Sequence, residues 1–166
     1  MKEYQLRLKG YYLHGDNVLL SYTVGERDVL ELPGADELFL YRDLEISGGS
    51  QNVSMLVGLL KGKAQIDGHQ AQVTGGNQLL AAHLIGERDG MRFRYDDGRL
   101  YLDIPAERAN QRFRVRYLAG DADQLKRSLA AAKVESELPD LSEFKRGGPR
   151  RWKETIATKG RLGAND

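Results

Sequence analysis

The sequence predicts an all-β fold, an antiparallel β-sandwich of jelly-roll-like type with about ten strands. Apolar and polar residues alternate with a period of two through most of the first 120 residues, as half-buried antiparallel strands require. Turn signals rich in glycine, aspartate and asparagine interrupt this alternation, so that strands follow one another every eight to twelve residues or so, the rhythm of a sandwich or barrel. The hydrophobic period changes only after residue 120.

Several local signals locate these strands. Pro33 is expected to end the third strand together with Gly34, because proline cannot donate to a β-ladder and glycine turns freely. The run Asp96-Asp97-Gly98 predicts a tight hairpin. The stretch from Leu79 to Ile85 would also suit a helix, but its length and its flanking glycines favour a strand. By their apolar positions the predicted strands lie at 4–8, 18–24, 29–32, 38–46, 53–59, 64–66, 79–85, 93–95, 100–104 and 113–117.

The C-terminal part is predicted to differ from the sandwich. Asp121 or Asp123 can cap a helix that follows, and Pro139 lies beyond its expected end. Between Lys145 and Arg161 there are seven basic residues and one acidic residue, which makes this the one strongly basic segment. We therefore expect three parts: a β-sandwich over 1–120, a short helix packed on it over 121–134, and an extended basic linker or strap over 135–166.

Composition excludes several classes of protein. The 166 residues include 25 Lys+Arg and 24 Asp+Glu, so no overall field attracts nucleic acid or an anionic membrane. The absence of cysteine excludes disulfides, thiolate metal sites, covalent haem attachment and cysteine nucleophiles. No apolar run reaches the roughly 18 residues that span a bilayer. The abrupt start, without a signal peptide, and the polar end are expected of a segment of a longer protein.

No motif in the sequence specifies a reaction. The glycine runs Gly48-Gly49-Ser50 and Gly75-Gly76-Asn77 precede strands, whereas a phosphate loop opens a helix. Asp96-Asp97-Gly98 is too short to supply the six or more oxygens of a calcium site. Neither a nucleophile elbow nor a carboxylate pair stands out, so we expect no metal, no cofactor and no catalytic residue. The three histidines have no spacing typical of metal ligands: His14, His69 and His83.

Three aromatic residues are candidates for ligand binding. Tyr11 and Tyr12 are neighbours, and adjacent residues of a strand face opposite ways, so one is expected in the core and the other at the surface. Exposed aromatic rings on a β-sandwich can stack on sugar rings, and Trp152 in the basic tail is a further candidate. A tyrosine that merely packs along a sheet edge is the alternative interpretation.

Arginines alternate with apolar residues from 112 to 117, which predicts a strand with one apolar and one cationic face. Nucleic-acid sites usually combine such charge with stacking aromatics; only Trp152 fits that description, so we expect no nucleic-acid partner. The cationic face is either solvated or in contact with an adjacent domain. Five arginines are candidates for such interdomain contacts: Arg112, Arg114, Arg116, Arg150 and Arg151.

Two stretches resemble a known family. LKGYYLHGDNVLLSYTVG at 8–25, followed by VLELPG at 29–34, resembles a domain of unknown function found in large secreted proteins of planctomycetes and verrucomicrobia. KRGGPRRWKETIATKG at 145–160 resembles the segment that links this domain to a β-propeller. Those proteins look like membrane-bound dehydrogenases, with a propeller similar to quinoprotein glucose dehydrogenases and a c-type cytochrome domain. The resemblance implies a periplasmic or secreted location and assigns the catalytic and haem-binding parts to other domains.

Two functions follow as hypotheses. The first is a non-catalytic accessory module of a secreted or periplasmic multidomain protein, which positions an adjacent propeller or cytochrome domain or binds glycan. The alternative is a stand-alone hydrolase or lyase whose acids converge from several strands. A glycan-binding module should present an exposed aromatic platform, and an enzyme a deep pocket with two or more converging acids or a histidine. A structural spacer should show neither feature.

Overall fold

The structure, a computed structural model, describes residues 6–36, 38–107, 109–123, 125 and 137–148. Within these residues it contains eleven strands and one named helix, α2 (Leu141–Phe144). The strands are β1 (Leu6–His14), β2 (Asn17–Val24), β3 (Arg27–Ala35), β4 (Leu40–Ile46), β5 (Val53–Leu59), β6 (Lys63–Asp67), β7 (Gln70–Gly75), β8 (Gln78–Gly86), β9 (Arg92–Asp96), β10 (Arg99–Ile104) and β11 (Gln111–Asp121).

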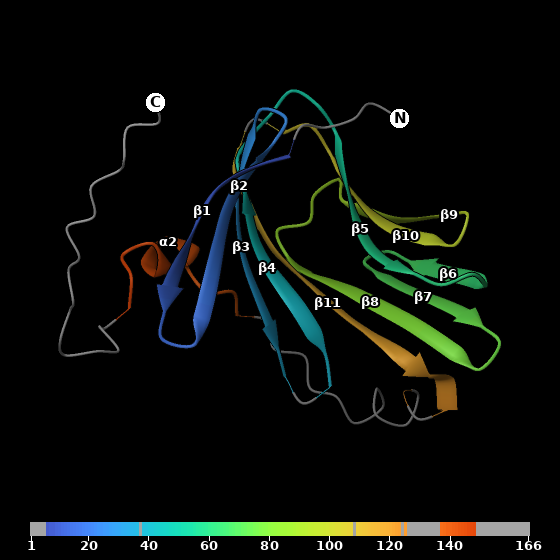
Figure 1. The fold of residues 1–166 in the computed structure, drawn as a ribbon. Coiled ribbons are helices and arrows are strands. Elements are labelled where there is room, and N and C mark those ends of the chain that lie inside the picture. Colours follow the sequence, from blue (N-terminus) through green and yellow to red (C-terminus); the bar gives the residue numbers. More distant parts are fainter. Residues whose placement is uncertain (1–5, 37, 108, 124, 126–136, 149–166) are drawn as a thin grey trace, which may run out of the picture.

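These strands form two antiparallel sheets of unequal width (Figure 1). In the described residues the large sheet has eight strands in the order β1-β2-β3-β4-β11-β8-β7-β6, and the small sheet has three in the order β5-β10-β9. The predicted antiparallel sandwich of about ten strands is therefore confirmed. The long chain return that places β11 between β4 and β8 is the main non-local feature of the fold.

The main core lies between the two sheets. Period-two alternation turns Phe113 and Val115 of β11 inward, and both side chains are 0% exposed. Leu100 and Leu102 of β10 meet them from the small sheet and are also fully buried. Burying a side chain of this size stabilises the fold by roughly 1.5–3 kcal/mol, so this layer supplies much of the stability.

The small sheet covers only part of the large one. The core it shares with the large sheet takes buried inner side chains from β3, β4, β11, β8 and β7, and Figure 1 shows the small sheet on that side of the molecule, away from β1 and the start of β2. The inner face of the large sheet, defined as the face toward the small sheet, therefore continues past its cover at the β1 edge.

The outer face of the large sheet, opposite the small sheet, carries the C-terminal helix. Leu141 of α2 is 1% exposed and packs on Leu19 and Leu32 of β2 and β3. The Asp140 side chain caps α2 by accepting a hydrogen bond from the Ser142 N–H at 2.9 Å. This helix falls inside 135–166, where an extended strap was expected. Of the helix expected at 121–134, the described residues 122, 123 and 125 are helical, and residues 124 and 126–134 lie outside the described part.

The strands differ from the prediction at three places. β7 was not predicted, and β1 is one continuous strand to His14, past the alternation seen at residues 4–8. The expectation that Pro33 ends its strand is wrong, because β3 continues to Ala35. Pro33 pairs with Arg42 of β4 but lies beyond the last residue pair with β2, which is Leu20 with Glu31. At Pro33 the strand therefore has a neighbour on one side only, and the missing N–H of proline is tolerated on the unpaired side.

No helix in the described part of the chain is long and apolar enough to cross a membrane.

The hairpin predicted at Asp96-Asp97-Gly98 is present between β9 and β10, with positive φ at Asp97 and Gly98. The segment 79–85 is the strand β8, as its glycine flanks predicted.

A buried arginine joins two of the loops that cross between the sheets. Arg27 of β3 is 1% exposed, and its Nη2 donates to the Pro105 carbonyl at 2.6 Å and to the Gly49 carbonyl at 3.3 Å. Gly49 lies before β5 and Pro105 follows β10. A Cβ on Gly49 would collide with the Arg27 side chain, so both loops close tightly on this guanidinium.

We expect Arg27→Ala to destabilise the protein by about 2–4 kcal/mol, because it leaves a cavity and two partly buried carbonyls without their donor. Urea denaturation of the variant and the wild type measures the difference. Arg92→Ala, which removes an exposed arginine of β9, should change stability by less than about 0.5 kcal/mol. An Arg27→Ala variant as stable as Arg92→Ala would contradict the role of Arg27.

Candidate binding surfaces

The inner face of β1 is apolar and exposed. Paired residues of two antiparallel strands lie on one face of the sheet, and Leu6 and Leu8 pair with Val24 and Tyr22, which pack on the core. Large exposed apolar patches mark binding surfaces more often than chance. We call the following four side chains, which are 69%, 61%, 64% and 61% exposed in this order, the open inner face: Leu6, Leu8, Tyr11 and Leu13.

A β-bulge creates this arrangement. The register between β1 and β2 shifts between Leu8 and Gly10, so that Lys9 has no residue opposite it. The shift changes which side chains face inward, and it turns Tyr11 to the same face as Leu8. The Lys9 Nζ instead reaches the Asp28 carboxylate at 2.5 Å on β3. β1 is also an edge strand of the large sheet, so its backbone can accept a further strand, except at the Leu13 carbonyl, which already accepts the Gly148 N–H at 3.1 Å.

The predicted aromatic candidates do not come together. Tyr11 and Tyr12 pair with Leu20 and Leu19 and lie on opposite faces, as expected for neighbours in a strand. The expectation that one of them is a core residue is wrong, because they are 64% and 36% exposed. Their opposite orientation prevents a joint stacking platform. Trp152 lies outside the described residues.

A cleft opens beside the open inner face, between the large sheet and β5. It has a volume of about 300 Å³ and a mostly apolar lining. Leu6 lines it at the β1 edge, Met55 and Leu56 line it from β5, and Tyr22 and Arg42 are among its polar groups. The open inner face and this cleft thus form one continuous surface at the uncovered edge of the sandwich.

A polar triad stands next to this cleft, on the inner face. The Glu31 carboxylate accepts two hydrogen bonds from Arg42, at 2.7 and 2.8 Å, and one from the Tyr22 hydroxyl at 2.7 Å. Burial opposes ionisation of Glu31, but the hydrogen bonds and charge of Arg42 and the Tyr22 hydroxyl outweigh it and lower the pKa of Glu31. Burial, with the neighbouring Glu31 charge, raises the pKa of the Tyr22 phenol. The triad is therefore Glu31⁻, Arg42⁺ and a neutral tyrosine near neutral pH.

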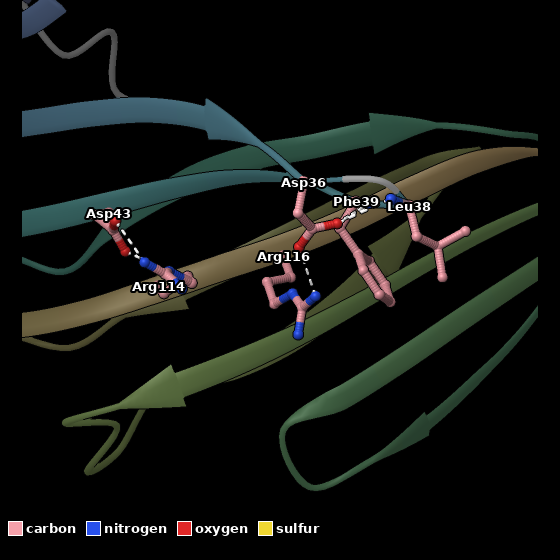
Figure 2. A network of polar contacts seen from close by, with 6 residues as sticks. All are labelled: Asp36, Leu38, Phe39, Asp43, Arg114 and Arg116. Carbon is pink, nitrogen blue, oxygen red and sulfur yellow. Dashed lines mark hydrogen bonds and ion pairs between the residues drawn. The ribbon is translucent and has the colours of Figure 1, made fainter. Parts of the chain in front are cut away.

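The outer face carries a ladder of arginines instead (Figure 2). Arg114 of β11 makes a two-pronged ion pair with Asp43 of β4, at 2.6 and 2.9 Å, and its guanidinium lies 4.5 Å from the Tyr41 ring centre. Two residues further along β11, the guanidinium of Arg116 lies 4.0 Å from the Phe39 ring centre and pairs with the Asp36 carboxylate. Each of the two arginines thus contacts one carboxylate and one aromatic ring.

The second arginine of the ladder also fixes a loop. The Arg116 Nη2 donates to Asp36 at 2.7 Å, and the same carboxylate accepts the backbone N–H groups of Leu38 and Phe39 (Figure 2). Burial opposes ionisation of Asp36, but these amides and Arg116 outweigh it and lower the pKa of its carboxyl. The β3–β4 connection is held to β11 in this way.

The expectation of an exposed cationic face on β11 is wrong for two of its three arginines. Arg114 and Arg116 are 7% and 6% exposed, because they are covered and paired within the chain. The side chain of Arg112 is 40% exposed and bonds Glu45 at 2.8 Å, so it is the member that a neighbouring domain could reach. Arg150 and Arg151 lie outside the described residues.

Within the described residues, no three His, Asp or Glu side chains converge in a way that could hold a metal ion. His14 lies against the Phe144 ring, with ring centres 5.1 Å apart. Burial, together with Arg88 and Arg116, lowers the pKa of His83, so this imidazole is neutral near pH 7. These surroundings are those of packing histidines.

The molecule thus belongs to the all-β sandwiches, with an exposed apolar surface at an uncovered sheet edge. Residues 1–31 match the model of a family described as "Domain of unknown function (DUF6797)". The match includes β1, β2 and the start of β3, and therefore the open inner face. The resemblance of the N-terminal part to a domain of unknown function is confirmed over this range. No curated protein and no solved structure matches the chain.

Sequence reasoning placed Arg42 on the apolar face of its strand but missed the inward-facing Arg27 and Glu31. Arg27 and Glu31 occupy the same inward phase of β3 as the buried Val29, and Arg42 occupies the phase of Leu44 on β4. Charged residues at core positions of an alternating strand are the signal that could have revealed them, since such groups are buried only when they are bonded.

The Glu31 triad predicts an acid-side loss of stability. A carboxylate whose pKa is lowered in the folded state stabilises the protein above its unfolded pKa of about 4.3, and this contribution disappears as the pH falls through the folded value. Glu31→Gln should therefore flatten the fall in unfolding free energy between about pH 5 and pH 2. In Arg42→Leu, burial outweighs the remaining Tyr22 hydrogen bond, and the Glu31 contribution should change sign. Denaturation at several pH values measures both, and a Glu31→Gln profile parallel to the wild type would refute the interaction.

The Tyr41 ring packs directly against the backbone of Gly34, where there is no room for a side chain. A Cβ at Gly34 would overlap the Tyr41 ring, so Gly34→Ala should displace this ring from Arg114 and destabilise the protein by about 1–3 kcal/mol. At Gly120 of β11 an added Cβ meets only Leu125, at an ordinary 3.6 Å, so Gly120→Ala is the matched control. Thermal and urea unfolding test the pair. In a Tyr41→Ala background the effect of Gly34→Ala should vanish; an undiminished effect would contradict this explanation.

Proposed function

We propose that this chain is a non-catalytic accessory module of a secreted or periplasmic multidomain protein, and that its open inner face docks a neighbouring domain. The observation that carries the proposal is the row of four apolar side chains, each more than 60% exposed, on one face of an edge strand. An apolar surface of this kind is stabilised when a partner removes it from water.

The make-up of the surface supports a protein partner. Three of its four side chains are leucines, and the adjacent cleft is mostly apolar. Hydrophobic interface cores have this composition and are poor in charge. The edge of β1 adds backbone groups to which a partner strand can bond. By resemblance of the two ends of the chain, the neighbours are a β-propeller and a c-type cytochrome domain.

Glycan binding on the same face is the second candidate, and the exposed ring of Tyr11 favours it. Only one aromatic ring is present among the four side chains, which favours docking. The enzyme alternative has less support. The described lining of the inner cleft contains no Asp, Glu or His, and the nearby Glu31 is engaged by Arg42 and Tyr22.

A binding measurement tests the docking. The polypeptide encoded after Asp166 is produced separately, and its affinity for this chain is measured by calorimetry. The double variant Leu6→Ser/Leu13→Ser should weaken binding at least tenfold, about 1.4 kcal/mol, while the fold is kept because both side chains are exposed. Leu59→Ser is the matched control, since Leu59 of β5 is 68% exposed but lies on the small sheet.

Three outcomes would contradict the proposal. They are a stop codon directly after Asp166, no binding between the two polypeptides, and binding that Leu6→Ser/Leu13→Ser leaves unchanged. Equal losses in the double variant and in Leu59→Ser would also count against a specific role of β1.

A further inference from the structure

A second surface lies on the outer face, on the opposite side of the large sheet from the open inner face. It is a pocket of about 460 Å³, formed over β3, β4 and β11 and closed at one side by residues 137–139 and α2. This volume falls within the roughly 300–1,000 Å³ typical of small-molecule sites. The lining residues that matter for recognition are Asn17, Tyr41, Asp43, Arg114, Glu137 and Phe144.

The floor of this outer pocket is rigid. Asp43 is 3% exposed, Arg114 is 7% exposed, and the two are joined by paired hydrogen bonds. The Arg114 guanidinium lies over the Tyr41 ring, which in turn lies over Gly34. Side chains fixed in this way keep their polar atoms in place before a ligand arrives, which reduces the entropy lost on binding.

The charges of the lining select the class of ligand. Two carboxylates, on Asp43 and Glu137, outnumber the one guanidinium of Arg114, so a phosphate or carboxylate ligand would meet net repulsion. A metal ion is disfavoured as well, because both oxygens of Asp43 accept from Arg114. What remains is a neutral ligand that both donates and accepts hydrogen bonds.

The remaining groups match a ring with hydroxyls on its rim. The Glu137 carboxylate and the Asn17 amide are planar groups that can each bond two adjacent hydroxyls, since each offers two polar atoms side by side. Phe144 of α2 is half-buried and offers an apolar ring edge or face to C–H groups. Acceptors, donors and an aromatic side chain around one open pocket are the features that bind a sugar.

We propose that the outer pocket binds a neutral saccharide of one or two units. This inference goes beyond docking and does not depend on it, because the pocket and the open inner face lie on opposite faces of one sheet. It also moves glycan binding away from Tyr11 and Tyr12, which lie on β1 and do not line the pocket. A module with both surfaces can hold a neighbouring domain and a glycan at the same time.

The test is a screen of the full chain on an array of neutral and acidic glycans, followed by calorimetry with the best neutral disaccharide. Asn17→Ala and Glu137→Ala each remove one exposed polar group and should weaken binding at least tenfold; the double variant should abolish it. Tyr11→Ala is the matched control on the opposite face and should bind as the wild type does. Sulfated or uronic-acid analogues should bind more weakly than the neutral sugar.

Failure of this proposal is distinguishable from failure of the docking proposal. No neutral saccharide bound at millimolar concentration, or binding unchanged in the Asn17→Ala/Glu137→Ala variant, would overturn the pocket assignment. Loss of saccharide binding in Tyr11→Ala would also overturn it and would place the sugar on the open inner face. The Leu6→Ser/Leu13→Ser variant, designed to disrupt docking, should bind the saccharide normally.

Discussion

The unequal width of the two sheets is the constraint from which the exposed features of this molecule follow. A sheet can bury its apolar face only where a second layer covers it. The small sheet covers β4, β11, β8, β7 and part of β3, whose inner side chains contribute to the core. β1 and part of β2 extend past that cover while keeping apolar inner side chains. The open inner face is thus the uncovered end of a continuous core surface, and a partner there would complete the sandwich.

Two ion pairs lie at the margins of this core, one on each face of the large sheet. The Glu31–Arg42 pair lies on the inner face near the open edge, and Arg114–Asp43 joins β4 to β11 on the outer face. Buried ion pairs are costly to desolvate, and their best-attested value is in specificity. A one-residue slip between β4 and β11 would move Arg114 to the apolar face. We therefore regard the outer ladder as the device that fixes the register of the non-local strand pair, and the outer pocket as a consequence of its rigid floor.

Local alternation was enough to predict most strands and the sandwich, including β8 and the β9–β10 hairpin. It missed β7, where the inward residues are only Ala71 and Val73 among glutamines. Pairing could not be predicted, because Arg114 and Asp43 are 71 residues apart and meet only through the sheet order. Tyr11 faces inward because of the β-bulge between Leu8 and Gly10, and the alternation of apolar residues does not reveal a bulge. The alternation correctly placed the arginines of β11 on one face, but Arg114 and Arg116 are buried by partners from β4 and from the β3–β4 connection, which the sequence of β11 cannot show.

Hydrogen–deuterium exchange of β1 most directly tests whether the open inner face is a docking surface. The exchange of its amides is compared between this chain alone and the chain joined to the polypeptide encoded after it. We expect the β1 amides to exchange at least tenfold more slowly in the longer protein, while the amides of β6, the other edge strand of the large sheet in the described residues, keep their rates. Equal exchange of β1 in both proteins would show that no neighbouring domain covers this face.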